Sequence, residues 1–175
     1  MQSSDLGTLS RNEDGRCALT FDRRYDHPVE KVWRALTETE HLRGWFAQYL
    51  DYDRSRLDLS NEGVELEFTP GPEADQPPVE TGRVTRSEPP TLLEYTWGEE
   101  ALRWELTPEG DRGTRLTFTN WFTDPSFAPF NALGWHTGLD RLDAVLNGKS
   151  PDGITLEADE TAATELQQRY EKAFG

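Results

Sequence analysis

The sequence predicts a single α+β domain in which one long helix covers one face of an antiparallel sheet. Three observations support this prediction. Several segments between residues 64 and 122 alternate apolar and polar residues, a pattern typical of strands. Residues 130–148 (FNALGWHTGLDRLDAVLNG) carry large apolar residues at spacings of three and four, which is typical of an amphipathic helix. A shorter helical pattern follows the first predicted strand near residue 26, and a length of 175 residues suits one domain with a sizeable core.

The first regular element is expected at residues 17–25 (CALTFDRRY), a strand with alternating apolar residues. A helix follows, because Asp26 can cap its N-terminus and Pro28 suits its first turn. The apolar stripe of this helix consists of Val29, Val32, Trp33 and Leu36. A second short helix over residues 38–46 is expected to point three side chains inward, namely Leu42, Trp45 and Phe46.

The middle of the chain is rich in predicted strands. They span residues 64–68, 79–87, 91–97, 101–108 and 114–122, and an irregular strand is expected over 47–59. Residues 69–78 read as a loop, and Gly82 indicates a bulge. In the last strand, one face carries Leu116, Phe118, Asn120 and Phe122. Because the opposite faces are mostly polar, the sheet is expected to be covered on one side only.

The segment 130–148 is expected to provide that cover. Its large apolar residues are Leu133, Trp135, Leu139, Leu142, Val145 and Leu146, and Asn147-Gly148 is a suitable C-terminal stop. A solvated face of this helix is expected to hold Asp140 and Asp143, which lie near Arg141. We expect three parts in the chain: a flexible N-terminal segment (1–16), the domain itself (17–148), and a linker with a final helix at 161–174 (149–175).

The composition argues against several classes of function. The formal net charge is −15 and the isoelectric point is about 4.5, whereas binding to nucleic acids or anionic membranes needs a basic face. The only cysteine, Cys17, allows no internal disulfide. The first fifteen residues lack the apolar core of a signal peptide, and no stretch approaches the ~20 apolar residues of a membrane span. We therefore expect a cytoplasmic monomer or homodimer without nucleic-acid partners.

No motif points to a metal, a cofactor or a catalytic centre. Residues 51–62 resemble a calcium loop, but Arg56 stands where the turn needs glycine and Leu59 offers no side-chain oxygen. The GKS sequence at 148–150 follows a helix rather than a strand, which argues against a phosphate loop. The sequence contains no GxSxG, HExxH or CxxC motif, and its three histidines are scattered. We expect no metal, no cofactor and no assigned catalytic residue.

Large aromatic side chains are expected to gather on the covered side of the sheet. Eight of them are Trp45, Phe46, Trp97, Trp104, Phe118, Phe122, Phe130 and Trp135. Each could be ordinary core, but together they suit an apolar pocket with few polar groups. Asn120 faces the same side, where its amide either makes a structural hydrogen bond or orients a ligand. His136 either packs or is exposed, or makes a polar contact at the cavity edge.

The order of elements resembles the helix-grip layout of the START-like or SRPBCC superfamily. Residues 27–46 (HPVEKVWRALTETEHLRGWF) resemble the entry motif of the bacterial family related to the activator of the 90-kDa heat-shock protein ATPase. Four further segments look like family segments, namely GRV at 82–84, the Tyr-x-Trp strand at 95–97, GTRLTFTN at 113–120 and GWHTGLDRLDAVLNG at 134–148. One departure is Asn120, where family members often carry histidine.

This resemblance implies a curved antiparallel sheet that grips the C-terminal helix around a hydrophobic cavity. Relatives use such a cavity for lipids, polyketides, plant hormones or other apolar small molecules. We predict a binder of a hydrophobic or aromatic small molecule, held by the eight aromatic residues above with Asn120, His136 and Leu139. Two alternatives stay open: a cyclase/aromatase-type or hydrolase-type enzyme with His136, Tyr95 or an acidic residue in the cavity, and a stress- or chaperone-related interaction protein.

Overall fold

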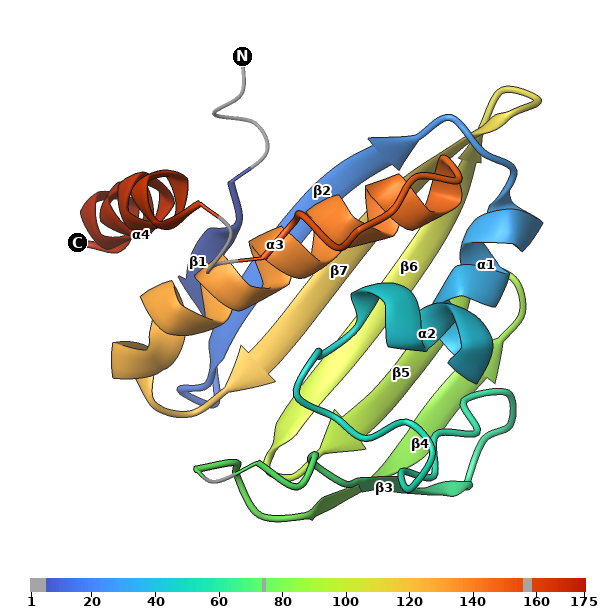
Figure 1. The fold of residues 1–175 in the computed structure, drawn as a ribbon, viewed down its shortest axis with the longest axis horizontal. Helices are drawn as coiled ribbons and strands as arrows, with labels where there is room; N and C mark the ends of the chain where they lie inside the picture. The colour runs from blue at the N-terminus through green and yellow to red at the C-terminus, as the bar shows by residue number, and fades with distance from the viewer. Residues whose placement is uncertain (1–5, 74, 156–158) are drawn as a thin grey trace.

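One curved antiparallel sheet forms the centre of the computed structural model, which describes residues 6–73, 75–155 and 159–175 (Figure 1). Over these residues the sheet has seven strands in the order β1-β2-β7-β6-β5-β4-β3. They are β1 (Thr8–Arg11), β2 (Cys17–Tyr25), β3 (Glu65–Phe68), β4 (Glu80–Glu88), β5 (Leu92–Trp97), β6 (Glu100–Glu109) and β7 (Gly113–Phe122). All neighbouring pairs are antiparallel, so the predicted fold class is confirmed.

Three of the described helices lie on one face of the sheet, and the last lies beside them (Figure 1). They are α1 (Val29–Thr37), α2 (Thr39–Trp45), α3 (Ala128–Leu146) and α4 (Glu160–Phe174). A short 3-10 helix (Pro125–Phe127) leads into α3, which begins and ends two residues earlier than predicted. Among the described helices none has the length and apolar character that crossing a membrane requires.

The apolar core lies between the sheet and helices α1 to α3. The predicted face of β7 is confirmed, because Leu116, Phe118, Asn120 and Phe122 are all buried. In α1 the buried side chains recur with helical spacing, and they are Val29, Val32, Ala35 and Leu36. The two patterns, one of period two and one of period 3.6, therefore meet in one core.

Residues 47–59 form turns rather than the predicted irregular strand. Among the described residues, this stretch makes strand-like pairing at only two isolated bridges. They join Leu50 to Pro70 and Arg56 to Glu67. The cause is Asp51, whose Oδ1 accepts hydrogen bonds from the backbone N–H groups of Asp53 (3.0 Å) and Arg54 (3.2 Å). A carboxylate that bonds to its own following backbone favours a turn over a strand ladder.

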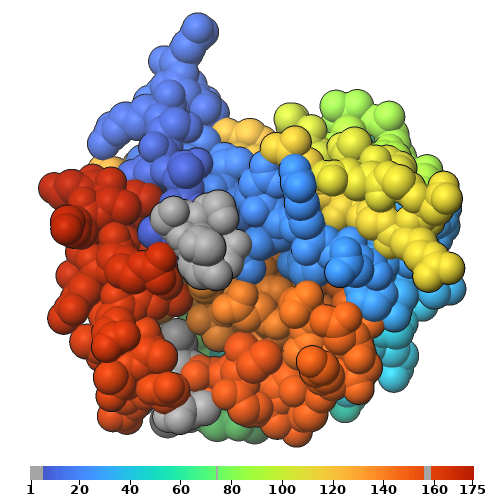
Figure 2. Space-filling view, turned by 90° about the horizontal axis from the view of Figure 1, so that it is seen from above, coloured from blue at the N-terminus to red at the C-terminus, as the bar shows by residue number. Residues whose placement is uncertain are grey.

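The two ends of the described chain meet. Of the predicted flexible segment over residues 1–16, residues 1–5 lie outside the described residues. β1 pairs with β2 at the sheet edge, and Gly7 N–H donates to the Tyr170 hydroxyl of α4 at 2.9 Å. Tyr170 is 0 % exposed. The final helix therefore packs on its own domain, beside α3 and the N-terminal strand (Figure 2).

Gly82 serves a close approach between strands rather than a bulge. A Cβ at this position would lie 1.8 Å from the backbone oxygen of Thr96 on the neighbouring strand. The register shift between β4 and β5 occurs further along, between Val84 and Arg86. Gly82 therefore lies where two backbones come close together. Besides a bulge, this is the other common reason for a glycine inside a strand.

Candidate functional site

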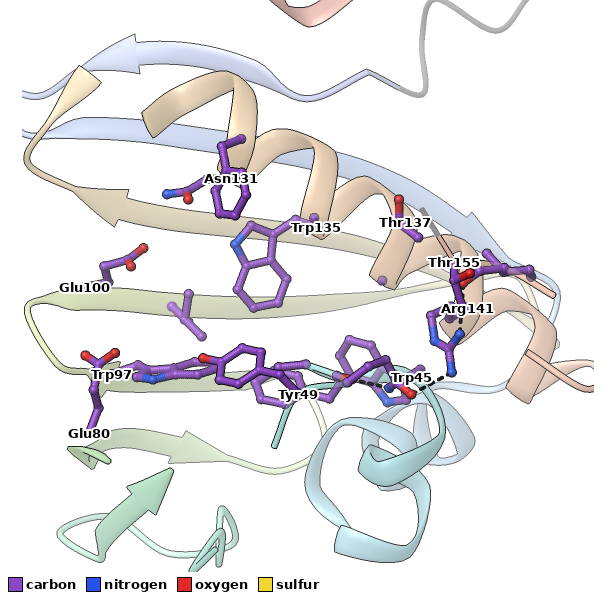
Figure 3. Close-up of a pocket in the computed structure, with 18 residues that line it drawn as sticks. Trp45, Tyr49, Glu80, Trp97, Glu100, Asn131, Trp135, Thr137, Arg141 and Thr155 are labelled. Carbon is purple, nitrogen blue, oxygen red and sulfur yellow. Dashed lines mark hydrogen bonds between the residues drawn. The ribbon is translucent and has the colours of Figure 1, made fainter. Parts of the chain in front are cut away.

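A cavity of about 470 Å³ lies between the sheet and α3. Its walls come from the end of α2 and the turn after it, from strands β4, β5 and β6, and from α3 with the segment that follows it. In Figure 3, Glu80 and Glu100 lie at one end of the cavity and Arg141 at the other, with Trp135 and Tyr49 between them. The cavity thus has an acidic end, an aromatic middle and an end with one arginine.

The middle of the cavity is aromatic. The Trp97 ring stacks on Phe68 at 4.2 Å between centroids, and Phe46 lies between Trp97 (5.5 Å) and Trp135 (5.8 Å). Tyr49 lies 6.3 Å from Trp97 and belongs to the same wall. These contacts hold the rings in fixed orientations, because offset and tilted aromatic pairs are favourable at such distances. The result is a pre-formed apolar surface.

The turn between β5 and β6 places an acid beside this wall. Trp97 and Glu100 are directly opposite each other across the two-residue turn Gly98-Glu99, so their side chains share one face of the sheet. Gly98 has φ +60°, a backbone conformation that favours glycine in such turns. A Cβ at Gly98 would also lie 2.0 Å from Oε2 of Glu80, so glycine leaves the space that the second carboxylate occupies.

A chain of hydrogen bonds fixes Glu100 in the wall. Asn120, 0 % exposed, donates from Nδ2 to Oε1 of Glu100 at 2.9 Å. Its Oδ1 accepts a hydrogen bond from Nε1 of Trp135 at 3.3 Å. Burial raises the pKa of the Glu100 carboxyl, the Asn120 hydrogen bond opposes that rise, and the negative charge of Glu80 adds to it. Asn120 thus positions two cavity residues, one from β6 and one from α3.

Replacing Glu100 by glutamine is expected to raise the melting temperature by a few degrees at neutral pH. The pKa of Glu100 is higher in the folded state, so folding favours the protonated carboxyl and is opposed by ionisation as the pH rises. Glutamine keeps an oxygen for Asn120 and has no charge to bury. The difference from the original protein should vanish below the ordinary pKa of 4.5, where both folded and unfolded carboxyls are protonated.

Calorimetry from about pH 4 to about pH 8 measures this difference. Glu99→Gln is the matched control, because it removes one charge from the same turn at an exposed side chain. Equal effects of the two substitutions at neutral pH would contradict the assignment of the gain to burial of Glu100.

Arg141 forms the other end of the cavity. The residue is 5 % exposed. Its Nη1 donates to the backbone oxygens of Pro151 and Ile154, and its Nη2 donates to the backbone oxygen of Gly44 and to Oε1 of Gln48, all at 2.9 Å. One guanidinium therefore joins α3 to the end of α2 and to the segment after α3, which forms part of the wall.

The predicted ligand-binding residues divide into two groups in the structure. Those that line the cavity are Trp45, Phe46, Trp97, Phe130 and Trp135. Phe130 is 73 % exposed. Trp104, Phe118, Phe122 and Leu139 are buried in the core instead. Trp104 stacks on Phe118 at 4.0 Å, and Phe118 lies 4.6 Å from Trp135, so these two rings support the lining from behind.

The polar candidates divide in the same way. Asn120 reaches the cavity through its two partners, Glu100 and Trp135. His136 lies on the side of α3 that faces α4, where its Nδ1 is 2.8 Å from the Tyr170 hydroxyl. Tyr95 is buried beneath Trp104, whose Nε1 donates to the Tyr95 hydroxyl. Of the groups considered for acid–base chemistry, the acidic residues Glu80 and Glu100 are the ones that line the cavity.

Several lining residues were not predicted from the sequence. Tyr49, Glu80, Glu100 and Arg141 all line the cavity. The signal for Glu100 is present in the hairpin, since its position opposite the predicted lining residue Trp97 follows from a two-residue turn. The signal for Arg141 is absent, because its acceptors come from backbone groups in three separate segments. Over the described residues, no group of three metal-ligating side chains comes together.

Comparisons with known proteins agree with this architecture. A model of the family described as "Activator of Hsp90 ATPase homolog 1-like protein" matches residues 26–147. CalU16 from Micromonospora echinospora has a similar structure, with a TM-score of 0.70, 24 % identity, and coverage of 96 % of this chain and 95 % of that chain. A conserved protein of unknown function from Enterococcus faecalis gives a TM-score of 0.69, 24 % identity, and coverage of 98 % and 92 %.

A protein from Bordetella parapertussis is also similar, with a TM-score of 0.64, 24 % identity, and coverage of 93 % of this chain and 88 % of that chain. At these identities the likeness establishes the fold and nothing about ligands. No curated protein matches the sequence.

Proposed function

This chain belongs to the family of activator of Hsp90 ATPase homolog 1-like proteins, and we propose that it binds a hydrophobic or aromatic small molecule between the sheet and α3. The observation that carries the proposal is the cavity of about 470 Å³ with aromatic rings in its walls. Small-molecule sites are typically concave, mostly apolar and supplied with a few fixed polar groups. Glu100, held by Asn120, and Arg141 are such groups here.

Three tryptophans in the cavity wall allow ligand binding to be measured by intrinsic fluorescence. Trp45, Trp97 and Trp135 line the cavity, so an apolar ligand that enters it should change the intrinsic fluorescence of the protein. A panel of fatty acids, aromatic amines, aromatic alcohols and polyketide-like phenols can be screened in this way and by thermal shift. A ligand at about 100 times its dissociation constant stabilises the folded state by roughly 2.7 kcal/mol.

Filling the cavity from α3 is expected to weaken ligand binding by more than about tenfold. Gly134 lines the cavity, and a Cβ at this position would meet no atom within 4 Å. The leucine side chain in Gly134→Leu would extend from this open position and occupy space that the ligand needs. Gly134→Ala is the matched control, because it gains about 1 kcal/mol of helix propensity and adds a single methyl group.

Titration of all three proteins with a hit from the panel tests this expectation. Retention of full affinity by Gly134→Leu would place the ligand elsewhere on the protein. A panel that neither stabilises the protein nor changes its fluorescence would contradict the proposed function itself.

A further inference from the structure

Two carboxylates line one end of the cavity without a cation beside them. Glu80 begins β4 and Glu100 begins β6, and both contribute to the cavity wall. Among the residues that the structure describes, no arginine, lysine or histidine nitrogen lies within 4.0 Å of either carboxylate. The positive charge of Arg16 lowers the pKa of Glu100 slightly against the effect of burial. The Nη2 of Arg16 donates to the backbone oxygen of Glu99.

We propose that the cavity selects a hydrophobic organic cation, whose protonated amine lies at the Glu80 and Glu100 end and whose apolar body lies among the aromatic rings. The inference rests on the proposed function and specifies its ligand class. Partly buried carboxylates repel each other when no cation is near, and a ligand ammonium group would remove that repulsion with charge-assisted hydrogen bonds. Burial is the main cause of the raised pKa of Glu100, and the negative charge of Glu80 adds to it.

The aromatic walls favour the same ligand class. Trp97, Tyr49 and Trp135 lie next to the acidic end (Figure 3). The faces of such rings carry negative potential and attract organic cations, and most strongly where water is excluded. Trp97 is held by stacking on Phe68 at 4.2 Å and lies opposite Glu100 across the turn. An aromatic ring and a carboxylate on neighbouring positions of one sheet face form two sides of an ammonium site.

The arginine at the opposite end of the cavity does not make the cavity a site for an anion. Both Nη atoms of Arg141 are occupied by four oxygen acceptors. Its Nε is buried and has no hydrogen-bond partner among the described residues. The guanidinium therefore presents no free N–H group to a ligand in the cavity. A ligand carboxylate would find no free donor on Arg141 and would share the cavity with Glu80 and Glu100.

Three indole compounds that differ in one group test the inference. Tryptamine carries an ammonium group, tryptophol a hydroxyl group, and indole-3-propionate a carboxylate, on similar apolar bodies. Isothermal titration calorimetry of the full chain at neutral pH should give tryptamine an affinity at least about tenfold above that of tryptophol, with the propionate weakest. The preference should shrink at high salt, because screening weakens interactions with partly exposed charges.

Substitutions assign the preference to the two acids. Glu80→Gln and Glu100→Gln should each reduce the ratio of tryptamine to tryptophol affinity several-fold, and the double variant should abolish it, while tryptophol binding persists. Glu99→Gln, an exposed side chain in the same turn, should leave the ratio unchanged.

The outcomes separate the inference from the function on which it rests. Equal binding of tryptophol and tryptamine, or tightest binding of the propionate, would overturn the cation inference and leave the small-molecule function standing. A tryptamine preference that survives the double variant would also overturn it. Failure of all three compounds to bind would overturn the inference, and failure of the wider apolar panel as well would overturn the proposed function.

Discussion

Replacing Trp104 by alanine is expected to lower the free energy of unfolding by about 3–5 kcal/mol. The residue is fully buried, stacks on Phe118 at 4.0 Å, and meets Trp45 edge-on at 5.5 Å. Its Nε1 also donates to the hydroxyl of the fully buried Tyr95 at 3.2 Å. Alanine would leave a large void among rigid rings and a buried hydroxyl that lacks its donor. Urea unfolding followed by far-ultraviolet circular dichroism measures the loss.

Trp121 provides the matched control for this prediction. Its ring lies on the opposite face of β7, is partly exposed, and contacts the Arg103 guanidinium at 5.2 Å. Trp121→Ala should therefore cost below about 1 kcal/mol. Similar losses for the two variants would contradict the placement of Trp104 in the core. A Trp104→Ala variant of normal stability that no longer binds ligand would favour the prediction made from the sequence, in which Trp104 contacts the ligand.

Replacing Arg141 by methionine is expected to lower the free energy of unfolding by about 2–4 kcal/mol. Methionine can fill the space of the side-chain stem but leaves the backbone oxygens of Gly44, Pro151 and Ile154 without their donors. Unsatisfied buried acceptors account for most of the loss. The segment after α3 should also become more sensitive to limited proteolysis, because Arg141 bonds to both this segment and α2.

Arg141→Lys and Arg34→Met are the comparison variants. Lysine keeps the charge but presents one nitrogen instead of a planar fork, so an intermediate loss is expected. Arg34 is exposed on α1, and its replacement should change stability by less than about 0.5 kcal/mol. A loss for Arg141→Met no larger than that for Arg34→Met would show that its hydrogen bonds contribute little to the fold.

The sequence predicts the fold well where local pattern and packing agree. Alternation in β6 and β7 and the helical stripe of α1 are read directly from residue spacing, because burial on one face selects that spacing. The prediction over residues 47–59 is wrong for a local reason. Asp51 accepts hydrogen bonds from Asp53 and Arg54 and so competes with strand pairing, which hydrophobic periodicity does not register.

The candidate site is predicted less completely, because the apolar character of a residue does not show whether it lines the cavity or lies in the core. Trp97 and Trp104 have the same character in the sequence, yet the first lines the cavity and the second lies behind it. Charged residues are harder still. Arg141 is buried by contacts with backbone oxygens from distant segments, so no sequence spacing identifies it. The position of Glu100 can be predicted from the sequence once the register of the hairpin is known, since that register places it opposite Trp97.

The hydrogen bond between Gly7 and Tyr170 has a consequence for the order in which the chain folds. It joins residues 163 positions apart, and closing a flexible loop of that length from the unfolded chain costs about 4–5 kcal/mol of entropy. One hydrogen bond offsets about 1 kcal/mol of this, so the contact can form only after the sheet has brought the two segments together. The pairing of Gly7 with Tyr170 is thus a late event in folding.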